Sequence, residues 1–325
     1  MLPYLHSFAA MTTRCELQLH GVDAGQGAAI AARIETRVAA LVRRYNFHAP
    51  DSWLTRAVNE RRSSRVALDA ETASVLEVVR QHAERCGGVF DITVGTYAAR
   101  LKRVRSTTEA AQVRRQLGAY TGLSRWSLDG DALQFDNAVT RIDLGGVIKE
   151  YAVDESVRLA REAGVPAGLI NYGGDLACWG LKPNGERFVA AVPHPLAPQR
   201  MLFGLDLHNQ ALTTSGHYAR QRSVKGGELS HVVGPVERDG ASASGKAGEA
   251  ERQAPSPWLS CSVVSHSALV SGIYSTALLL RGDIALPAEA MALLVDAHGK
   301  VHTLEGQGAP AAHTPEHAPA PALAA

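Results

Sequence analysis

Three glycine turns in this sequence carry the residue types that could bind a phosphate. They are Gly145-Gly146, Gly173-Gly174 and Ser215-Gly216, and each follows a segment with strand-like patterning. Because glycine has no Cβ, backbone N–H groups in such turns can approach an anion closely. Each turn taken alone could equally end a strand for packing reasons, with Asp143 and Asp175 acting only as local turn caps. None of them matches a dinucleotide or Walker phosphate motif.

The richest of these segments is Asp143–Asp154, "DLGGVIKEYAVD". It combines a carboxylate, two glycines, a lysine and the start of a helical pattern. A lysine beside a glycine turn can supply positive charge to an oxyanion, although a lone lysine at a helix start is more often exposed to solvent. The segment therefore indicates either an anion-binding turn or a plain strand-to-helix connection, and the rest of the chain has to decide between them.

Alternating and helical patterns predict the elements that would position these turns. Helical spacing of apolar residues predicts helices over 25–44 and 69–85, with "CGG" ending the second. "TRIDLGG" and "AGLINYGGDLACWG" are typical of strands that run into glycine turns, and "WSLDGDALQF" of a two-residue hairpin at Asp129-Gly130. "HSALVSGIYSTALLLRG" predicts a late apolar helix, and "MALLVDAHGKVHTL" a terminal hairpin.

The order of these elements favours an α+β fold, because strands and helices are mixed without strict βαβ alternation. We expect a single domain over 1–304 that contains a polar, glycine- and serine-rich loop insert at 237–257. The Ala-, Pro- and His-rich tail at 305–325 is expected to be disordered.

Composition excludes several classes of partner. Lys and Arg total 33 against 32 Asp and Glu, so the balance gives no support to a nucleic-acid or membrane-surface partner. The longest apolar runs are too short for a spanning helix, and the N-terminus lacks the pattern of a signal peptide or lipobox. The four cysteines are scattered, which favours reduced thiols. We therefore expect a cytoplasmic protein without membrane insertion.

Eight segments of the chain, taken in order, carry recognisable motifs. These segments are "FAAMTTRCELQLHG", "YNFHAPDSWLTRAVN", "FDITVGTY", "DLGGVIKEYAVD", "LINYGGDL", "LTTSGHY", "HVVGP" and "SVVSHSALVSGIYSTALLL". Each is similar to a motif of one family, so the chain resembles the ApbE-type FAD:protein FMN transferases over nearly its whole length up to about Gly282.

The resemblance implies mixed sheets with flanking helices in two lobes around an FAD cleft. It implies that a magnesium ion binds the pyrophosphate, and that FMN moves from FAD to a threonine or serine of an acceptor bearing an S/T-G-A-S/T site, with release of AMP. Lys149 and His231 would be catalytic, with Asp175 near the adenine side. By resemblance the FAD-binding positions are Met11, Thr93, Gly95, Asp143, Gly145, Gly146, Lys149, Asp175, Ser215 and Gly216.

The expected metal site departs from the family pattern. By resemblance its ligands are the backbone carbonyl of Ile148, the Thr276 hydroxyl and an aspartate four residues before Thr276, where this chain has Gly272. Spacing of i and i+4 places the last two on one helix face. Glu150 stands where the family usually has glycine, so the paired exchange suggests that Glu150 supplies the missing oxygen. The alternative is an ordinary acidic residue in a first helical turn.

Three further positions differ: Thr12 replaces a glycine, Gly234 replaces an aspartate, and Ile148 replaces a smaller residue. Such departures keep three functions open. The first is an active FMN transferase, the second a flavin-binding module without turnover, and the third an FAD pyrophosphatase that yields FMN and AMP.

Overall fold

The computed structural model describes residues 2–217, 221–230, 232, 234 and 257–307. Its largest element is an antiparallel sheet in the order β1-β2-β6-β7-β10-β13-β14-β15. Its strands are β1 (Tyr4–Ala10), β2 (Thr13–His20), β6 (Ala167–Tyr172), β7 (Asp175–Trp179), β10 (Ala211–Gly216), β13 (Trp258–Ser265), β14 (Met291–Asp296) and β15 (Val301–Glu305).

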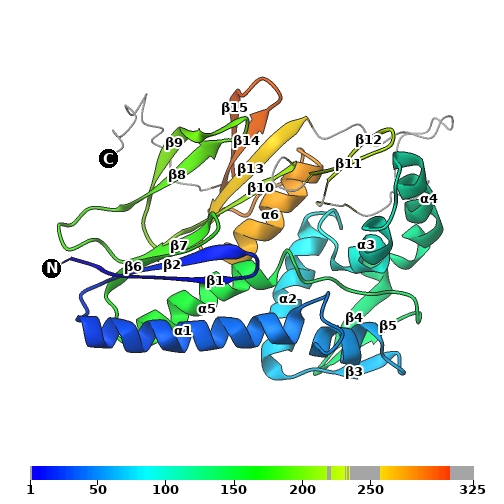
Figure 1. Cartoon of the computed structure of the whole chain (residues 1–325), viewed down its shortest axis with the longest axis horizontal. Coiled ribbons are helices and arrows are strands. Elements are labelled where there is room, and N and C mark those ends of the chain that lie inside the picture. Colours follow the sequence, from blue (N-terminus) through cyan, green and yellow to red (C-terminus); the bar gives the residue numbers. More distant parts are fainter. Residues whose placement is uncertain (1, 218–220, 231, 233, 235–256, 308–325) are drawn as a thin grey trace.

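Three helices cover one face of this sheet, as Figure 1 shows. They are α1 (Ala24–Tyr45), α5 (Ile148–Glu162) and α6 (Ala268–Leu280). Helix α6 is mostly apolar, and all its residues except Thr276 and Leu280 are buried, which fits its place between the sheet and the neighbouring helices. The other face carries a smaller apolar cluster against the hairpin of β8 (Phe188–His194) and β9 (Ala197–Leu207).

The remaining elements gather beside the ends of α1 and α6 (Figure 1). The helical segments among them are α2 (Ala70–Arg85), α3 (Gly95–Leu101), α4 (Thr107–Leu117), the π-helix η1 (Leu54–Asn59) and the 3₁₀ turns η2 (Ile92–Val94), η3 (Gly118–Tyr120) and η4 (Leu123–Arg125). The strands among them are β3 (Arg65–Ala67), β4 (Trp126–Asp129), β5 (Ala132–Phe135), β11 (Gln221–Val224) and β12 (Gly227–Ser230).

The mixed α/β arrangement confirms the predicted fold class, and several predicted elements are in place. Helices α1 and α2 begin after Asp23 and Asp69, whose side chains accept backbone N–H groups of their first turns. Between β4 and β5 the two-residue loop is Gly130-Asp131, one position later than predicted. The predicted insert and tail lie outside the described residues almost entirely, so this division of the chain stays a prediction.

One predicted strand is wrong. The segment "TRIDLGG" (140–146) forms no ladder with any other described strand. Asn59 of η1 bonds both backbone groups of Ile142 instead: the Ile142 N–H donates to Asn59 Oδ1 at 2.8 Å, and Asn59 Nδ2 donates to the Ile142 carbonyl at 2.9 Å. A side-chain amide thus satisfies the polar groups that a neighbouring strand would otherwise pair.

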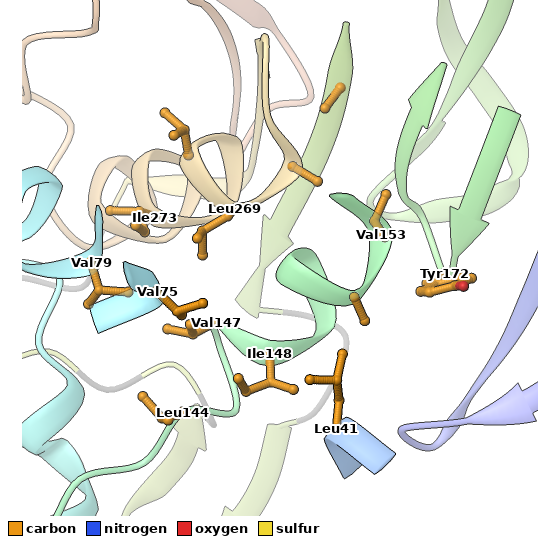
Figure 2. Packing of buried hydrophobic residues seen from close by; sticks show 14 of the residues in the cluster. Leu41, Val75, Val79, Leu144, Val147, Ile148, Val153, Tyr172, Leu269 and Ile273 are labelled. Carbon is orange, nitrogen blue, oxygen red and sulfur yellow. The ribbon is translucent and has the colours of Figure 1, made fainter. Parts of the chain in front are cut away.

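The start of α5 is anchored in the largest apolar cluster. Val147 and Ile148 are buried there, and Figure 2 shows both side chains among residues that include Leu41 of α1 and Leu269 of α6. This packing accounts for a bulky isoleucine at 148, because its side chain fills core volume and points away from solvent. The first turn of α5 is consequently fixed against three helices.

Candidate active site

The segment that leads into the first glycine turn is held by residues of two distant motifs. Besides the Asn59 clamp, the Asp143 N–H donates to the Ile92 carbonyl at 2.8 Å, and the Arg141 N–H donates to Thr96 Oγ1 at 3.0 Å. A Cβ on Gly95 would lie 2.7 Å from the Ile142 carbonyl carbon and 2.8 Å from the Asp143 nitrogen. Gly95 is therefore required for the close approach of two backbones.

Thr93 lies behind this segment and is fully buried. Its hydroxyl donates to Asp91 and accepts the Gly122 N–H at 2.7 Å, and Asp91 Oδ2 also accepts that N–H at 2.9 Å. Burial raises the pKa of Asp91. The Thr93 side chain thus ties the 91–95 loop to Gly122, and its expected contact with FAD stays a prediction.

The first glycine turn itself is open. Gly145 and Gly146 are exposed, and the nearest atom to a Cβ on Gly146 would be 3.9 Å away. Asp143 Oδ1 accepts the Gly145 N–H at 2.8 Å, which is the local capping role that aspartate often has in turns. Burial raises the pKa of Asp143. The turn leaves backbone accessible at the entrance to α5.

Lys149 and Asp175 meet directly, which the sequence did not predict. The Lys149 ammonium forms an ion pair with Asp175 Oδ2 at the start of β7, and it lies 3.5 Å from Glu150 Oε1. Asp175 is almost fully buried, whereas the Lys149 side chain remains 27% exposed. The expected roles of Lys149 near the flavin or its phosphates and of Asp175 near the adenine side stay predictions, and the ion pair shows that the two side chains are partners.

Glu150 fills the space that a side chain at position 272 would occupy. A Cβ on Gly272 would lie 2.6 Å from Glu150 Cγ, 3.3 Å from Cδ and 3.5 Å from Cβ. Glu150 is only 5% exposed, and its Oε2 atom is buried without a hydrogen-bond partner. The two departures from the family motifs are therefore in van der Waals contact across the α5–α6 interface.

A group of hydroxyls lies next to Gly272 along α6. Ser215 Oγ of β10 lies 2.8 Å from Ser275 Oγ and 3.1 Å from Thr276 Oγ1. Gly272 and Thr276 are four residues apart, so they share one helix face. These contacts link five expected site residues from four elements: Lys149, Glu150, Asp175, Ser215 and Thr276. Their roles toward FAD and a metal ion stay predictions.

Asp154 fixes α6 relative to α5. Its carboxylate accepts the Ala268 N–H at 2.8 Å, the Leu269 N–H at 3.0 Å and the Ser267 hydroxyl at 2.7 Å. This role was not predicted, because its signal in the sequence is weak: an aspartate one turn after Glu150, and a serine that could cap the late helix. Burial raises the pKa of Asp154, although these three donors oppose that effect.

Loss of this cap should disturb the site as well as the fold. We expect Asp154→Ala to lower the free energy of unfolding by about 2 kcal/mol, because it leaves two backbone N–H groups of α6 without their acceptor. Asp23→Ala removes the exposed cap of α1 and is the matched control. Thermal melts should show a loss for both variants, whereas FAD affinity should fall only for Asp154→Ala. Equal FAD affinity in the two variants would contradict a positioning role.

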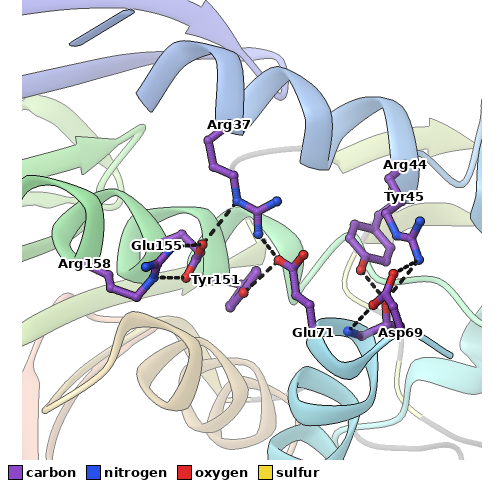
Figure 3. A network of polar contacts seen from close by, with 9 residues as sticks. Arg37, Arg44, Tyr45, Asp69, Glu71, Tyr151, Glu155 and Arg158 are labelled. Atoms are coloured by element: carbon purple, nitrogen blue, oxygen red, sulfur yellow. Dashed lines mark hydrogen bonds and ion pairs between the residues drawn. The ribbon is translucent and has the colours of Figure 1, made fainter. Parts of the chain in front are cut away.

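A polar network holds α5 from its other side. Arg37 of α1 forms ion pairs with Glu155 of α5 and Glu71 of α2, and Tyr151 donates to Glu71 at 2.8 Å (Figure 3). Arg158 also bonds Glu155. Since Tyr151 follows Glu150 directly, the network fixes the helical turn that carries Lys149 and Glu150.

Of two other predicted site residues, Met11 is among the described residues and His231 is not. Met11 lies in the β1–β2 turn, where Met11 and Thr12 have φ values of 50° and 62°. That left-handed conformation explains why glycine suits position 12 and why threonine is strained there. The backbone of this turn region is near the second glycine turn, because the Gly173 N–H donates to the Arg14 carbonyl. His231 lies outside the described residues.

The arrangement matches a known family along almost its whole length. The model of the ApbE family matches residues 11–303. This chain belongs to the ApbE family. The fold of ApbE proteins is shared as well: the chain is similar to the ApbE protein of Thermotoga maritima, with a TM-score of 0.76, 23% identity and coverage of 92% of this chain and 96% of that one.

Other ApbE relatives agree. The flavin transferase ApbE of Vibrio cholerae has a TM-score of 0.75 at 20% identity, covering 94% of this chain and 97% of that one. Among curated sequences, the FAD:protein FMN transferase of Escherichia coli K12 is 25% identical over 235 residues, 69% of this chain and 67% of that protein. A second FAD:protein FMN transferase, from Vibrio cholerae, is 26% identical over 57% of each chain.

Two features are absent from the described residues of this ApbE chain. No described helix has both the length and the apolar character to cross a membrane. No three His, Cys, Asp or Glu side chains among those residues come together as a ready-made metal site.

Proposed function

We propose that this chain is an FAD:protein FMN transferase. It cleaves the pyrophosphate of FAD, attaches FMN through a phosphoester to a threonine or serine of an acceptor protein, and releases AMP. The observation that carries the proposal is the convergence, in an ApbE chain, of Lys149 and the open Gly145-Gly146 turn with the hydroxyl oxygens of Ser215 and Thr276.

The residues fit the substrate in charge and in position. An exposed glycine turn lets a pyrophosphate approach the backbone closely, and the Lys149 ammonium stabilises negative charge that grows on its oxygens. In the reaction the acceptor oxygen bonds the FMN phosphorus, and the bond from that phosphorus to the bridging oxygen breaks. AMP leaves with that oxygen, and the acceptor hydroxyl passes its proton to water. We propose His231 as the second catalytic residue, beside Lys149, because its segment "HVVGP" is similar to a family motif.

The residues also fit a magnesium ion. The fit rests on the buried Glu150 Oε2 without a hydrogen-bond partner, next to the helix face that carries Thr276. The Ile148 carbonyl and the Thr276 hydroxyl are the further oxygens proposed to hold the ion, and hard cations prefer oxygen ligands of this kind. When bound, the ion would neutralise charge on the pyrophosphate. Thr276 would then be fixed partly by Ser215, whose hydroxyl it contacts.

One assay tests the proposal and separates it from its rivals. The protein is incubated with FAD, Mg²⁺ and an acceptor bearing an S/T-G-A-S/T site, and the acceptor is examined for in-gel flavin fluorescence. We expect a fluorescent acceptor and one AMP per label. An acceptor whose target threonine is replaced by valine is the control.

Two results would reject the transferase. Free FMN and AMP without labelling would indicate an FAD pyrophosphatase. Bound, intact FAD would indicate a flavin-binding module. The loss of the family aspartate at Gly272 favours this function if Glu150 does not replace the missing carboxylate. The proposal includes the S/T-G-A-S/T acceptor class. Labelling of a second acceptor of unrelated sequence, measured in the same assay, shows whether the enzyme selects this motif.

A further inference from the structure

Gly272 of α6 and Glu150 of α5 are complementary in volume. All three heavy atoms nearest to a Cβ on Gly272 belong to the Glu150 side chain, and the closest is 2.6 Å away. Any side chain at 272 would therefore displace Glu150, and Glu150 can lie here only because position 272 is glycine. Gly272 does not have a positive φ, so the glycine is needed for space and not for backbone conformation.

The buried carboxylate lacks a full set of partners. Lys149 lies 3.5 Å from Oε1 and is itself paired with Asp175, while Oε2 is buried without a hydrogen bond. A buried carboxylate oxygen with no donor is costly, since it has lost water without a replacement. A structural glutamate would be expected to use both oxygens. An oxygen kept free near the helix face that carries Gly272 and Thr276 is instead suited to a ligand that brings positive charge.

We propose that Glu150 has taken over the metal-binding carboxylate of this site, from α5 instead of α6. Glu150 binds a hard divalent cation of the Mg²⁺ class together with the FAD pyrophosphate and the Thr276 hydroxyl. This inference rests on the proposed function, because the pyrophosphate supplies the remaining ligands. It assigns Gly272 a role too: the glycine leaves the volume into which the Glu150 side chain reaches.

The position of Lys149 follows from this arrangement. Without ligand, its ammonium balances Asp175 and one oxygen of Glu150. A divalent cation at Glu150 would repel that ammonium, so Lys149 must move toward the pyrophosphate when both bind. Its partly exposed side chain has room for such a change, whereas Glu150 and Asp175 are enclosed.

The test measures FAD affinity by flavin fluorescence, first in EDTA and then in saturating Mg²⁺. For the wild-type protein we expect Mg²⁺ to tighten FAD binding at least tenfold. Glu150→Gln should reduce this ratio to about one, because an amide keeps the volume but not the charge; loss of metal-site contacts typically costs 10–100-fold in metal affinity. Glu162→Gln, at the exposed end of the same helix, is the control and should keep the wild-type ratio.

A reciprocal exchange gives the sharper result. Gly272→Asp alone should lose the Mg²⁺ effect and melt at lower temperature, because the new Cβ meets Glu150 and adds a second carboxylate. The double variant Glu150→Gly/Gly272→Asp removes the clash and returns the carboxylate to α6. We expect it to recover a Mg²⁺ effect within about threefold of wild type. If Glu150→Gln does not fold, this double variant carries the test.

The outcomes separate the inference from the function. The role of Glu150 is overturned if Mg²⁺ tightens FAD binding as much in Glu150→Gln as in the wild type, or if Mg²⁺ does not tighten it in the wild type. Either result counts even if FMN transfer is intact. Failure of the folded double variant to regain the effect also counts against it. Failure of the wild type to bind FAD in either buffer would instead reject the proposed function.

Discussion

Lys149→Met is expected to lower the rate of FMN transfer by at least about 100-fold, the loss typical when one preorganised donor to a developing oxyanion is removed. Methionine keeps most of the length and apolar volume of lysine but has no charge. The variant should also unfold about 1–3 kcal/mol more easily, because Asp175 and Glu150 lose their shared cation. This is below the cost for a fully buried pair, since Lys149 is 27% exposed.

Lys149→Arg distinguishes the two effects. It keeps the positive charge, so most of the unfolding free energy should return. Its planar, larger head cannot occupy the place of a compact ammonium, so transfer should stay at least tenfold below wild type. The role of Lys149 would be refuted if Lys149→Met, folded and saturated with FAD, labelled the acceptor at more than one third of the wild-type rate.

Gly95→Ala is expected to destabilise the protein by about 3 kcal/mol, at the upper end of the range for overpacking. The added Cβ would lie 2.7 Å from a backbone carbon and 2.8 Å from a backbone nitrogen, neither of which can rotate away as a side chain could. The melting temperature should fall by roughly 6 °C or more. The clash also pushes the 141–143 segment, so FAD affinity should fall with stability.

Gly146→Ala is the matched control within the same site. A Cβ there meets only Phe90 at 3.9 Å, an ordinary van der Waals distance, and this glycine has no positive φ. Its melting temperature should stay within about 2 °C of the wild type. Equal melting temperatures for the two alanine variants would show that the backbone at Ile142 can yield, and that Gly95 has no special packing role.

The sequence predicted the helices well because their signals are local. Helices α1 and α2 each combine apolar residues at helical spacing with an aspartate at the N-cap, and both begin within one residue of the predicted start. The β6–β7 hairpin was also predictable, since Gly173 and Gly174 both adopt the positive φ that such a tight turn needs.

Long-range pairing was harder to predict. The 140–146 segment has the composition of a strand, but its partner is the Asn59 side chain about 80 residues earlier. Sequence patterning indicates whether a residue lies on the buried or the exposed face of an element. It does not indicate which distant group forms hydrogen bonds with that residue's backbone. The first strand, β1, was missed because its side chains alternate only between half-buried and exposed, with apolar Leu5 on the exposed side, so its sequence pattern is weak.

At the site, residue types were predictable but their contacts were not. The exchange of carboxylate between positions 272 and 150 suggested a link, and the structure places the two residues in contact. Nothing in the sequence indicated that Asp175 would meet Lys149, because that pairing depends on how α5 lies across the start of β7. Motifs thus predicted the members of the site, while tertiary packing determined their partners.

The bridge from Asp154 to the start of α6 has a consequence for synthesis on the ribosome. Asp154 is translated 113 residues before Ser267, whose hydroxyl it accepts. At about 5–20 residues per second, α5 must wait roughly 6–25 s for the helix that it caps. Until then, Lys149, Glu150 and Asp154 lack their contacts with α6. A nascent chain therefore cannot bind flavin early. The site is complete only after α6 and the last strands of the main sheet have been translated.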